Sequence, residues 1–366
     1  MKRNEDGKPM KDPWDILMKV PEALSETERE IIQSIYMEKG RDTFLKEASE
    51  RKIVPFVAES CCYLGIDKEY WKELLSQYEI RTKQIIKMLD ELFCKFETHD
   101  CISPCITENF GALLVTGKHM GCFCSGDVDI SADYLEKDKI RAALIELGYT
   151  EVKRKDYHSN IEQDEYICPE QYLNDFYINL VWKPVIREKA YTINQKKMIV
   201  WMENERKKAS VYDNTKIRIL SPEAMLIHCI YHISAGHYYC ASPGVRLLTE
   251  IDRIIRTNFI NWDNIWERAK ELQITKRIQI ALIITAKVLD TPSDRYIVVK
   301  PVTKSVKKLT DGFYQNKDGI MTVIEPVGFA DRLKTDIISD RGPFIPAMIR
   351  KTVYAISWFL IKLRRK

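Results

Sequence analysis

The first hundred residues carry a helical pattern of apolar positions. Between residues 26 and 96, apolar side chains recur every three or four residues, the period of an amphipathic helix. Gly40 and Gly65 interrupt the pattern where helices are expected to end. No segment before residue 110 shows the alternation of a strand. The stripes that define these helices are Ile31, Ile32, Ile35 and Tyr36, followed by Ile85, Ile86, Leu89 and Leu92.

The pattern then changes to short runs that predict strands. Residues 112–116 (ALLVT) form a brief apolar run that ends at Gly117, as a buried strand does. Residues 127–130 (DVDI) alternate charged and apolar side chains, which is typical of a strand with one polar face. Two more strands are predicted at 165–168 and 175–182.

Helix signals return between and after these strands. Asp133 precedes an apolar stripe that ends near Leu147, and Glu136 stands at the spacing of a capping box. Ser221 followed by Pro222 is a strong start signal for another helix. Helical periodicity then continues to about residue 289.

These elements together predict an α+β protein. We expect a helical N-terminal region over 1–109, a small mixed-sheet module over 110–210 and a helical C-terminal region over 211–290. The remainder, 291–366, is expected to be a mixed segment that ends in a basic amphipathic tail.

The composition is that of an ordinary globular protein. The 366 residues are 45% hydrophobic and 30% charged, which argues against disorder. A formal net charge of +4 is too small to indicate a nucleic-acid partner. Residues 1–12 lack an apolar signal core, and the longest apolar run, 353–361, is about half a membrane span. We therefore expect a cytoplasmic protein whose ten cysteines are reduced thiols.

The most informative chemistry lies in residues 113–130. Residues two apart in a strand point to the same face, so Asp127 and Asp129 are expected to project together. Two convergent carboxylates can hold the Mg²⁺ or Mn²⁺ ions that assist phosphoryl transfer. The small residues Gly117, Ser125 and Gly126 would let backbone N–H groups approach phosphates closely.

At this point the chain resembles the uncharacterised nucleotidyltransferase family of bacterial surface-polysaccharide and peptide gene clusters, within the DNA polymerase beta superfamily. The resemblance covers roughly residues 30–290. It is carried by a strand ending in a glycine motif, the Asp-hydrophobic-Asp strand, a helix ending in Gly148-Tyr149, a further strand at 176–182 and the helix at 221–237.

Three positions depart from the family pattern. Thr116-Gly117 stands where the family has Lys-Gly, with Lys118 on the far side, and Cys124-Ser125 stands where an Arg is common. The third acid of the pattern falls on Asn179, which cannot act as a base and supplies no charge. Asp164 or Glu165 on the preceding strand is the alternative source of that charge.

The resemblance implies transfer of a nucleoside monophosphate from a nucleoside triphosphate to an acceptor hydroxyl. Asp127 and Asp129 would hold the metal, Asn179 would complete the catalytic set, and Gly117, Lys118, Ser125 and Gly126 would contact the phosphates. The acceptor is a small molecule, a saccharide or a protein. Two alternatives stay open: a non-catalytic binding protein with the same fold, which Asn179 favours, and a glycosyltransferase that uses an Asp-X-Asp metal site.

Several other groups have more than one interpretation. His228 and His232, with His237 beyond them, lie on one helix and are interpreted as structural residues, contacts of the nucleotide or catalytic module, or metal ligands. Arg246 is a candidate phosphate contact. The basic clusters at 153–155 and 206–208 are solvated surface or attract phosphate. The tail at 349–366 packs on the protein or makes peripheral contact with an anionic membrane.

Overall fold

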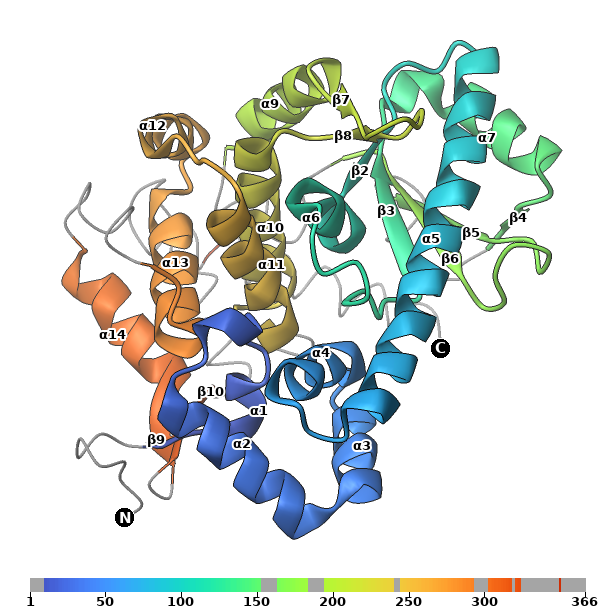
Figure 1. The fold of residues 1–366 in the computed structure, drawn as a ribbon. Helices are drawn as coiled ribbons and strands as arrows, with labels where there is room; N and C mark the ends of the chain where they lie inside the picture. Colours follow the sequence, from blue (N-terminus) through green and yellow to red (C-terminus); the bar gives the residue numbers. More distant parts are fainter. Residues whose placement is uncertain are drawn as a thin grey trace, which may run out of the picture.

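The computed structural model describes residues 10–152, 163–183, 194–239, 244–292, 302–317 and 320–323, together with Ile349. Its described elements form a mixed sheet with helices before and after it in the chain, which confirms the predicted α+β class (Figure 1). The basic cluster at 153–155 and the tail beyond Ile349 lie outside the described residues.

The larger sheet contains seven strands in the order β4-β5-β6-β3-β2-β8-β7. β3 is parallel to β6 and antiparallel to β2, while β2 is parallel to β8. The sheet is therefore mixed, and β3 lies at its centre. The strands are β2 (Cys105–Thr107), β3 (Asp127–Ser131), β4 (Thr150–Glu151), β5 (Gln163–Ile167), β6 (Tyr177–Val181), β7 (Ser210–Val211) and β8 (Arg218–Ile219).

One face of this sheet is buried under helices. Val128 and Ile130 of β3 are almost fully buried, as the alternation of the sequence predicts. They share a core with α5 (Lys68–Thr98), α6 (Glu108–Thr116) and α7 (Lys137–Glu146). The opposite, polar face of β3 is left for Asp127 and Asp129.

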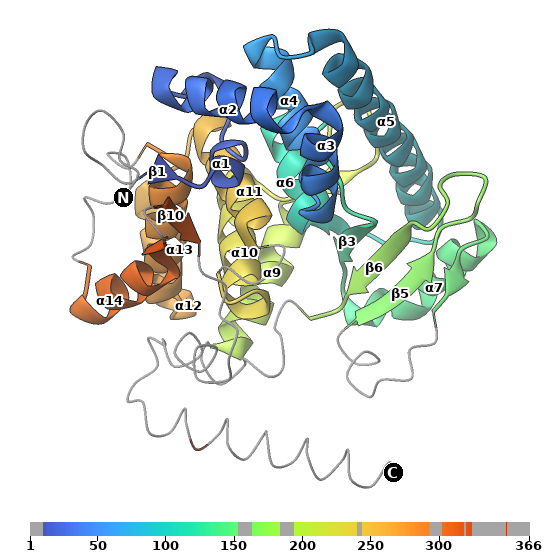
Figure 2. The same cartoon turned by 90° about the horizontal axis from the view of Figure 1, so that it is seen from below.

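Helix α5 connects two hydrophobic cores. Its 31 residues give a length of about 46 Å. The first half, around Trp71, packs with the other N-terminal helices, and the second half, from Ile85 to Phe96, packs on the sheet. Figures 1 and 2 show it running from the N-terminal helices along the sheet. The N-terminal helices are α1 (Pro13–Ile16), α2 (Glu26–Lys39), α3 (Arg41–Glu50) and α4 (Val54–Leu64).

The second core is formed mainly by helices of the C-terminal half. α10 and α11 pack against each other and against α6, which places the C-terminal helices beside the sheet module. Ser221 caps α10 by accepting a hydrogen bond from Ala224, as predicted. The elements are α9 (Gln195–Lys207), α10 (Pro222–Gly236), α11 (Gly244–Thr257), α12 (Trp262–Leu272), α13 (Thr275–Leu289) and α14 (Lys304–Phe313).

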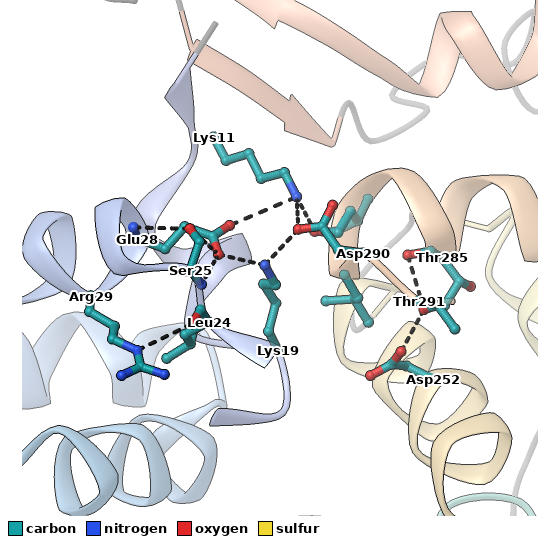
Figure 3. A network of polar contacts seen from close by, with 12 residues as sticks. Lys11, Lys19, Leu24, Ser25, Glu28, Arg29, Asp252, Thr285, Asp290 and Thr291 are labelled. Carbon is teal, nitrogen blue, oxygen red and sulfur yellow. Dashed lines mark hydrogen bonds and ion pairs between the residues drawn. The ribbon is translucent and has the colours of Figure 1, made fainter. Parts of the chain in front are cut away.

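The N-terminal segment is joined to the C-terminal half by strands and by charge. β1 (Met10–Lys11) pairs with β10 (Ile320–Val323), which also pairs with β9 (Tyr314–Lys317). The buried Lys19 contacts Glu28 of α2 and Asp290 at the end of α13, each at 2.6 Å (Figure 3). Distant parts of the sequence are thus held together by one buried cation.

One secondary-structure prediction was wrong. Residues 112–116 belong to helix α6 and not to a strand. A run of four apolar residues followed by a threonine fits a buried helix as well as a buried strand. Before residue 110, where the sequence shows no convincing strand signal, the structure has the two short strands β1 and β2. β2 has three residues, all buried, too few to show a period of two.

Most other predictions agree with the structure. The strands expected at 165–168 and 175–182 are β5 and β6, and the helix after Asp133 is a short 3-10 turn followed by α7. Glu136 makes no capping box; its carboxylate accepts hydrogen bonds from the Ile102 and Ser103 N–H groups. The nine described cysteines are free thiols. None of the described helices combines the length and apolar character needed to span a membrane.

Candidate functional site

Two aspartates occupy the polar face of the central strand β3. Asp127 and Asp129 point to the same side of the sheet, while Val128 between them is buried in the core. The Ser125 hydroxyl donates a short hydrogen bond to Asp127 and fixes its carboxylate. Asp129 is only 8% exposed, so its charge has little access to water.

Asn179 of β6 lies beside both aspartates. The parallel register of β3 and β6 pairs Asp129 with Asn179. The Asn179 Nδ2 group donates to Asp127 Oδ2 at 2.8 Å and to Asp129 Oδ1 at 3.2 Å. The side chain is buried, and its Oδ1 has no hydrogen-bond partner among the described residues. Turning the amide by 180° would present this oxygen to the aspartates instead of the N–H group.

A third carboxylate reaches the same place from the other side of β3. Thr107, the last residue of β2, pairs with Asp129, and Glu108 follows as the first residue of α6. Glu108 has a φ of 55°, in the left-handed region that normally favours glycine. Its negative charge repels that of Asp129.

Glu108 is not among the site residues predicted from the sequence. The predicted strand-to-turn transition lies at 113–117, whereas the strand in the structure is β2, at 105–107, and Glu108 follows it directly. The only available signal was the tripeptide Cys-Ile-Thr before Glu108, which has strand-forming residues but is too short to be distinctive.

Two histidines of helix α10 contact the Glu108 carboxylate. His228 Nε2 lies 3.3 Å from Glu108 Oε1, and His232 Nδ1 lies 2.9 Å from Glu108 Oε2. Because the two histidines are four residues apart, they lie on one face of the helix. Of the interpretations offered for this pair, the structure shows contact with the sheet module, through Glu108.

The site concentrates negative charge in a buried place. Burial, and then repulsion by Glu108 and Asp127, raises the pKa of Asp129 well above its usual range. Burial also favours the neutral form of Glu108, but attraction to His232 and His228 outweighs it and lowers the pKa of Glu108. Burial disfavours the charged form of His232, yet Glu108 outweighs that effect and raises the pKa of His232. A cation near Asp129 would relieve the repulsion among the carboxylates.

The donor set suits a hard divalent ion. Carboxylate and amide oxygens are the preferred ligands of Mg²⁺ and Mn²⁺. The Asp127 and Asp129 carboxylates converge, and the partnerless Asn179 Oδ1 is a buried acceptor on the amide between them. Within the described ranges, no three His, Cys, Asp or Glu side chains already stand in the arrangement of a metal site. The residues fit such an ion once the amide turns its oxygen toward the aspartates.

A cavity of about 40 Å³ adjoins the aspartates through Ser125. Arg246 of α11 borders it, and its Nη1 donates to Cys124 Sγ at 3.4 Å. The Arg246 Nε group has no hydrogen-bond partner among the described residues. Glu250, one turn later, also lines the cavity; burial raises its pKa to about 7 although Arg246 opposes the rise. The cavity therefore offers a cationic group close to the carboxylates.

The four residues predicted to contact phosphates lie at two ends of one connector. Gly117 ends α6 with a φ of 60°, and its N–H bonds the Leu113 and Leu114 carbonyls. Lys118 follows and is exposed. At the other end Ser125 contacts Asp127, and the Gly126 carbonyl accepts a hydrogen bond from the Tyr177 N–H. The structure thus brings Ser125 and Gly126 to the aspartates.

The two alternative acids on β5 differ in position. Asp164 pairs with Lys137 at 2.6 Å and accepts a hydrogen bond from Trp182 Nε1, so its charge is already engaged. Glu165 pairs with Asn179 in the antiparallel register and therefore lies on the same sheet face, one strand further from Asp129.

One member of the basic cluster at 206–208 is buried. Arg206 is 4% exposed and donates to Ser131 Oγ at 3.2 Å, while Lys207 and Lys208 are exposed. The long aliphatic part of an arginine packs well in a core, and a three-residue cluster in the sequence gives no indication of which member turns inward.

Comparison with known proteins identifies the family. Neither the curated proteins nor the solved structures gave a match. A family model described as "Uncharacterised nucleotidyltransferase" matches residues 38–290, a range that includes β3, β6, Glu108 and both α10 histidines. Since the match spans more than half of the 366 residues, the chain belongs to this uncharacterised nucleotidyltransferase family.

Proposed function

We propose that this nucleotidyltransferase moves a nucleoside monophosphate from a nucleoside triphosphate to an acceptor hydroxyl, with Mg²⁺ or Mn²⁺ held by Asp127 and Asp129. The observation that carries the proposal is the convergence of these two carboxylates on the polar face of β3, next to Asn179. Membership of a nucleotidyltransferase family supports transfer of a nucleotidyl group in general.

The reaction is an in-line displacement at the α-phosphorus. The acceptor oxygen forms a bond to that phosphorus, and the bond to the bridging oxygen breaks, so that pyrophosphate leaves with the electron pair. The hydroxyl proton passes to a nearby base or to water. Divalent ions, when bound, offset the charge that develops on the attacking and leaving oxygens.

The chain's own residues would hold and orient the substrates. Ser125 fixes the Asp127 carboxylate, and Asn179 holds the spacing of the two aspartates. The cavity beside Ser125 is the proposed phosphate side of the site, where the unpartnered Nε of Arg246 is available to an anion. Gly117, Lys118 and Gly126, on the connector between α6 and β3, are the other proposed contacts.

A second candidate function is a non-catalytic binding protein that keeps the fold and the nucleotide site. Asn179 favours it, because an amide at this buried position supplies neither a charge nor a base. The acceptor, a cytoplasmic location, a bacterial origin and a place in the DNA polymerase beta superfamily remain predictions from the sequence.

The first test is calorimetric titration of nucleoside triphosphates with and without Mg²⁺. We expect Asp127→Asn/Asp129→Asn to lose at least about tenfold in Mg²⁺-dependent affinity, about 1.4 kcal/mol. The charge-matched control, Asp138→Asn/Asp213→Asn, changes two exposed aspartates outside the site and should bind as the wild type does. Equal affinity of the wild type and the Asp127/Asp129 variant would contradict the assignment.

Turnover separates the two candidate functions. Release of pyrophosphate from the bound triphosphate in the presence of candidate acceptors supports the transferase. Tight binding of triphosphate with hydrolysis and transfer both at the background rate supports the binding protein.

A further inference from the structure

The candidate metal site lacks a negative charge on β6, where Asn179 stands. The register of β3 and β6 places Asn179 opposite Asp129, at the position of the third acid in the family pattern described above. The Asn179 amide is buried between the aspartates, and its Oδ1 has no partner among the described residues. An acceptor buried without a partner is costly, which indicates that a ligand belongs at this amide.

The missing charge is present on the opposite side of β3. Glu108 begins α6 directly after Thr107 of β2, which pairs with Asp129 of β3, and its negative charge repels that of Asp129. Glu165 on β5 is separated from β3 by the whole of β6. Glu108 is therefore better placed than Glu165 to act with the two aspartates.

The surroundings of Glu108 hold it in place without exhausting its bonding capacity. His228 contacts one carboxylate oxygen and His232 the other. Each carboxylate oxygen has two acceptor sites, so one site on each oxygen stays available for a cation or a bound water. The backbone at Glu108 has a φ of 55°, which an L-residue adopts at a cost and glycine adopts freely. The chain thus keeps a glutamate where the backbone favours glycine.

We propose that Glu108 supplies the third carboxylate of the divalent-metal site, in place of the acid that the family pattern has at the position of Asn179. The ion would draw the three carboxylates together, since they do not stand in the arrangement of a metal site before it binds. Glu108 is a metal-site residue in this assignment, and His228 and His232 are positioning residues that orient its two oxygens. The inference rests on the proposed function, because it adds a residue to the same site.

The test is the binding of Mn²⁺ to the full chain without nucleotide. The affinity is measured by calorimetry and by the electron paramagnetic resonance signal of the free Mn²⁺. Glu108→Gln is expected to lower the affinity for Mn²⁺ at least about tenfold, because one of the negative charges that attract the ion is removed. Adding the charge back on the other strand, in Glu108→Gln/Asn179→Asp, is expected to restore affinity to within about threefold of the wild type. The rescue is the readout that a merely structural role for Glu108 would not produce.

Two further variants make the result specific. Glu165→Gln is the matched control, since it removes a carboxylate from the same sheet face one strand away, and its Mn²⁺ affinity should equal that of the wild type. Glu108→Gly removes the charge while suiting the positive φ, so it should fold even where Glu108→Gln does not, and it should lose Mn²⁺ affinity equally. Thermal melting of each variant confirms that it is folded.

The outcomes distinguish this inference from the proposed function. Mn²⁺ affinity that is lost in Asp127→Asn/Asp129→Asn but kept in both Glu108 variants overturns the role of Glu108 alone. A double variant as weak as Glu108→Gln contradicts the exchange of charge between the two positions. If Asp127→Asn/Asp129→Asn binds Mn²⁺ as tightly as the wild type does, the metal is not held by these aspartates, and both proposals are contradicted.

Discussion

Individual residues show how this protein holds charge away from water. Glu59 of α4 accepts from Arg253 Nη2 at 2.7 Å and lies 2.5 Å from His119 Nδ1, and its side chain is 14% exposed. Burial alone would raise the pKa of Glu59, but Arg253 and His119 outweigh burial and lower it to about 2. The ionised carboxylate thereby joins α4, the connector after α6 and α11 around the cavity.

The low pKa of Glu59 predicts a pH-dependent contribution to stability. The unfolded chain protonates this carboxyl near its ordinary pKa of 4.5, and the folded chain does so only near 2. The stabilisation of the fold by the ionised Glu59 carboxylate is therefore complete above about pH 4.5. It is lost as the pH falls toward 2, because the unfolded chain takes up the proton at a higher pH than the folded chain does. We expect Glu59→Gln to lower the free energy of unfolding by about 3 kcal/mol at pH 7.

Chemical denaturation at pH 7, 4.5 and 3.5 checks this prediction. The gap between the wild type and Glu59→Gln should narrow as the pH falls. The control, Glu97→Gln, removes a carboxylate whose partner Lys216 is largely exposed, and it should change stability by less than about 1 kcal/mol. A gap that stays constant across this pH range would mean that the charge of Glu59 is not what stabilises the fold.

At the scale of elements, the site depends on the close approach of α6 and α10. Glu108 begins α6, and the histidines that hold it come from α10. Gly111, one turn into α6, allows this approach: a Cβ atom there would lie 2.5 Å from the Met225 methyl carbon and 3.2 Å from the Ile106 carbonyl oxygen. Met225 is completely buried, so it has little room to move.

We therefore expect Gly111→Ala to destabilise the protein by about 1 kcal/mol net. Overpacking in a filled core costs about 1–3 kcal/mol, and the better helix propensity of alanine returns up to about 1 kcal/mol. Gly312→Ala in α14 is the matched control, because nothing lies within 4 Å of a Cβ atom there. The denaturation midpoint should fall for Gly111→Ala and rise for Gly312→Ala. A higher midpoint for Gly111→Ala would show that a Cβ atom fits between α6 and α10.

At the scale of the whole molecule, one buried cation links the N-terminal segment to the C-terminal half of the chain. Lys19 is 2% exposed and contacts Glu28 and Asp290, which stand at the start of α2 and the end of α13 (Figure 3). Glu28 also accepts from the Ser25 N–H in a capping box, so the lysine contact and the helix cap share one carboxylate. Lys11 adds a second contact to Asp290 at 2.6 Å.

Removing this cation should destabilise the fold as a whole. Lys19→Met keeps the length of the side chain but removes the 2.6 Å contact to the buried Glu28 and leaves it with the longer contact to Lys11 Nζ at 3.9 Å, for which we expect a loss of about 2 kcal/mol. Lys216→Met, which breaks a largely exposed ion pair with Glu97, should cost less than about 1 kcal/mol. Equal denaturation midpoints for the two variants would contradict a structural role for the buried contact.

The sequence predicted those elements whose pattern was long enough to be distinctive. The alternation in residues 127–130 identified β3, and Ser221-Pro222 identified the start of α10, because local chain geometry and capping chemistry decide these features. The apolar residues 112–116 were assigned to a strand although they belong to α6, because so short a run carries no period. The three residues of β2 gave no usable pattern at all.

For the candidate site, the sequence determined the pair on β3 and only the tertiary structure determined its neighbours. Asp127 and Asp129 share a face because a strand repeats every two residues, which is a local property. Glu108, His228 and His232 meet beside Asp129 because β2 pairs with β3 and α10 packs on α6. The contacts of Glu108 with the two histidines join residues 120 and 124 positions apart, and no local period in the sequence records which distant side chains will meet.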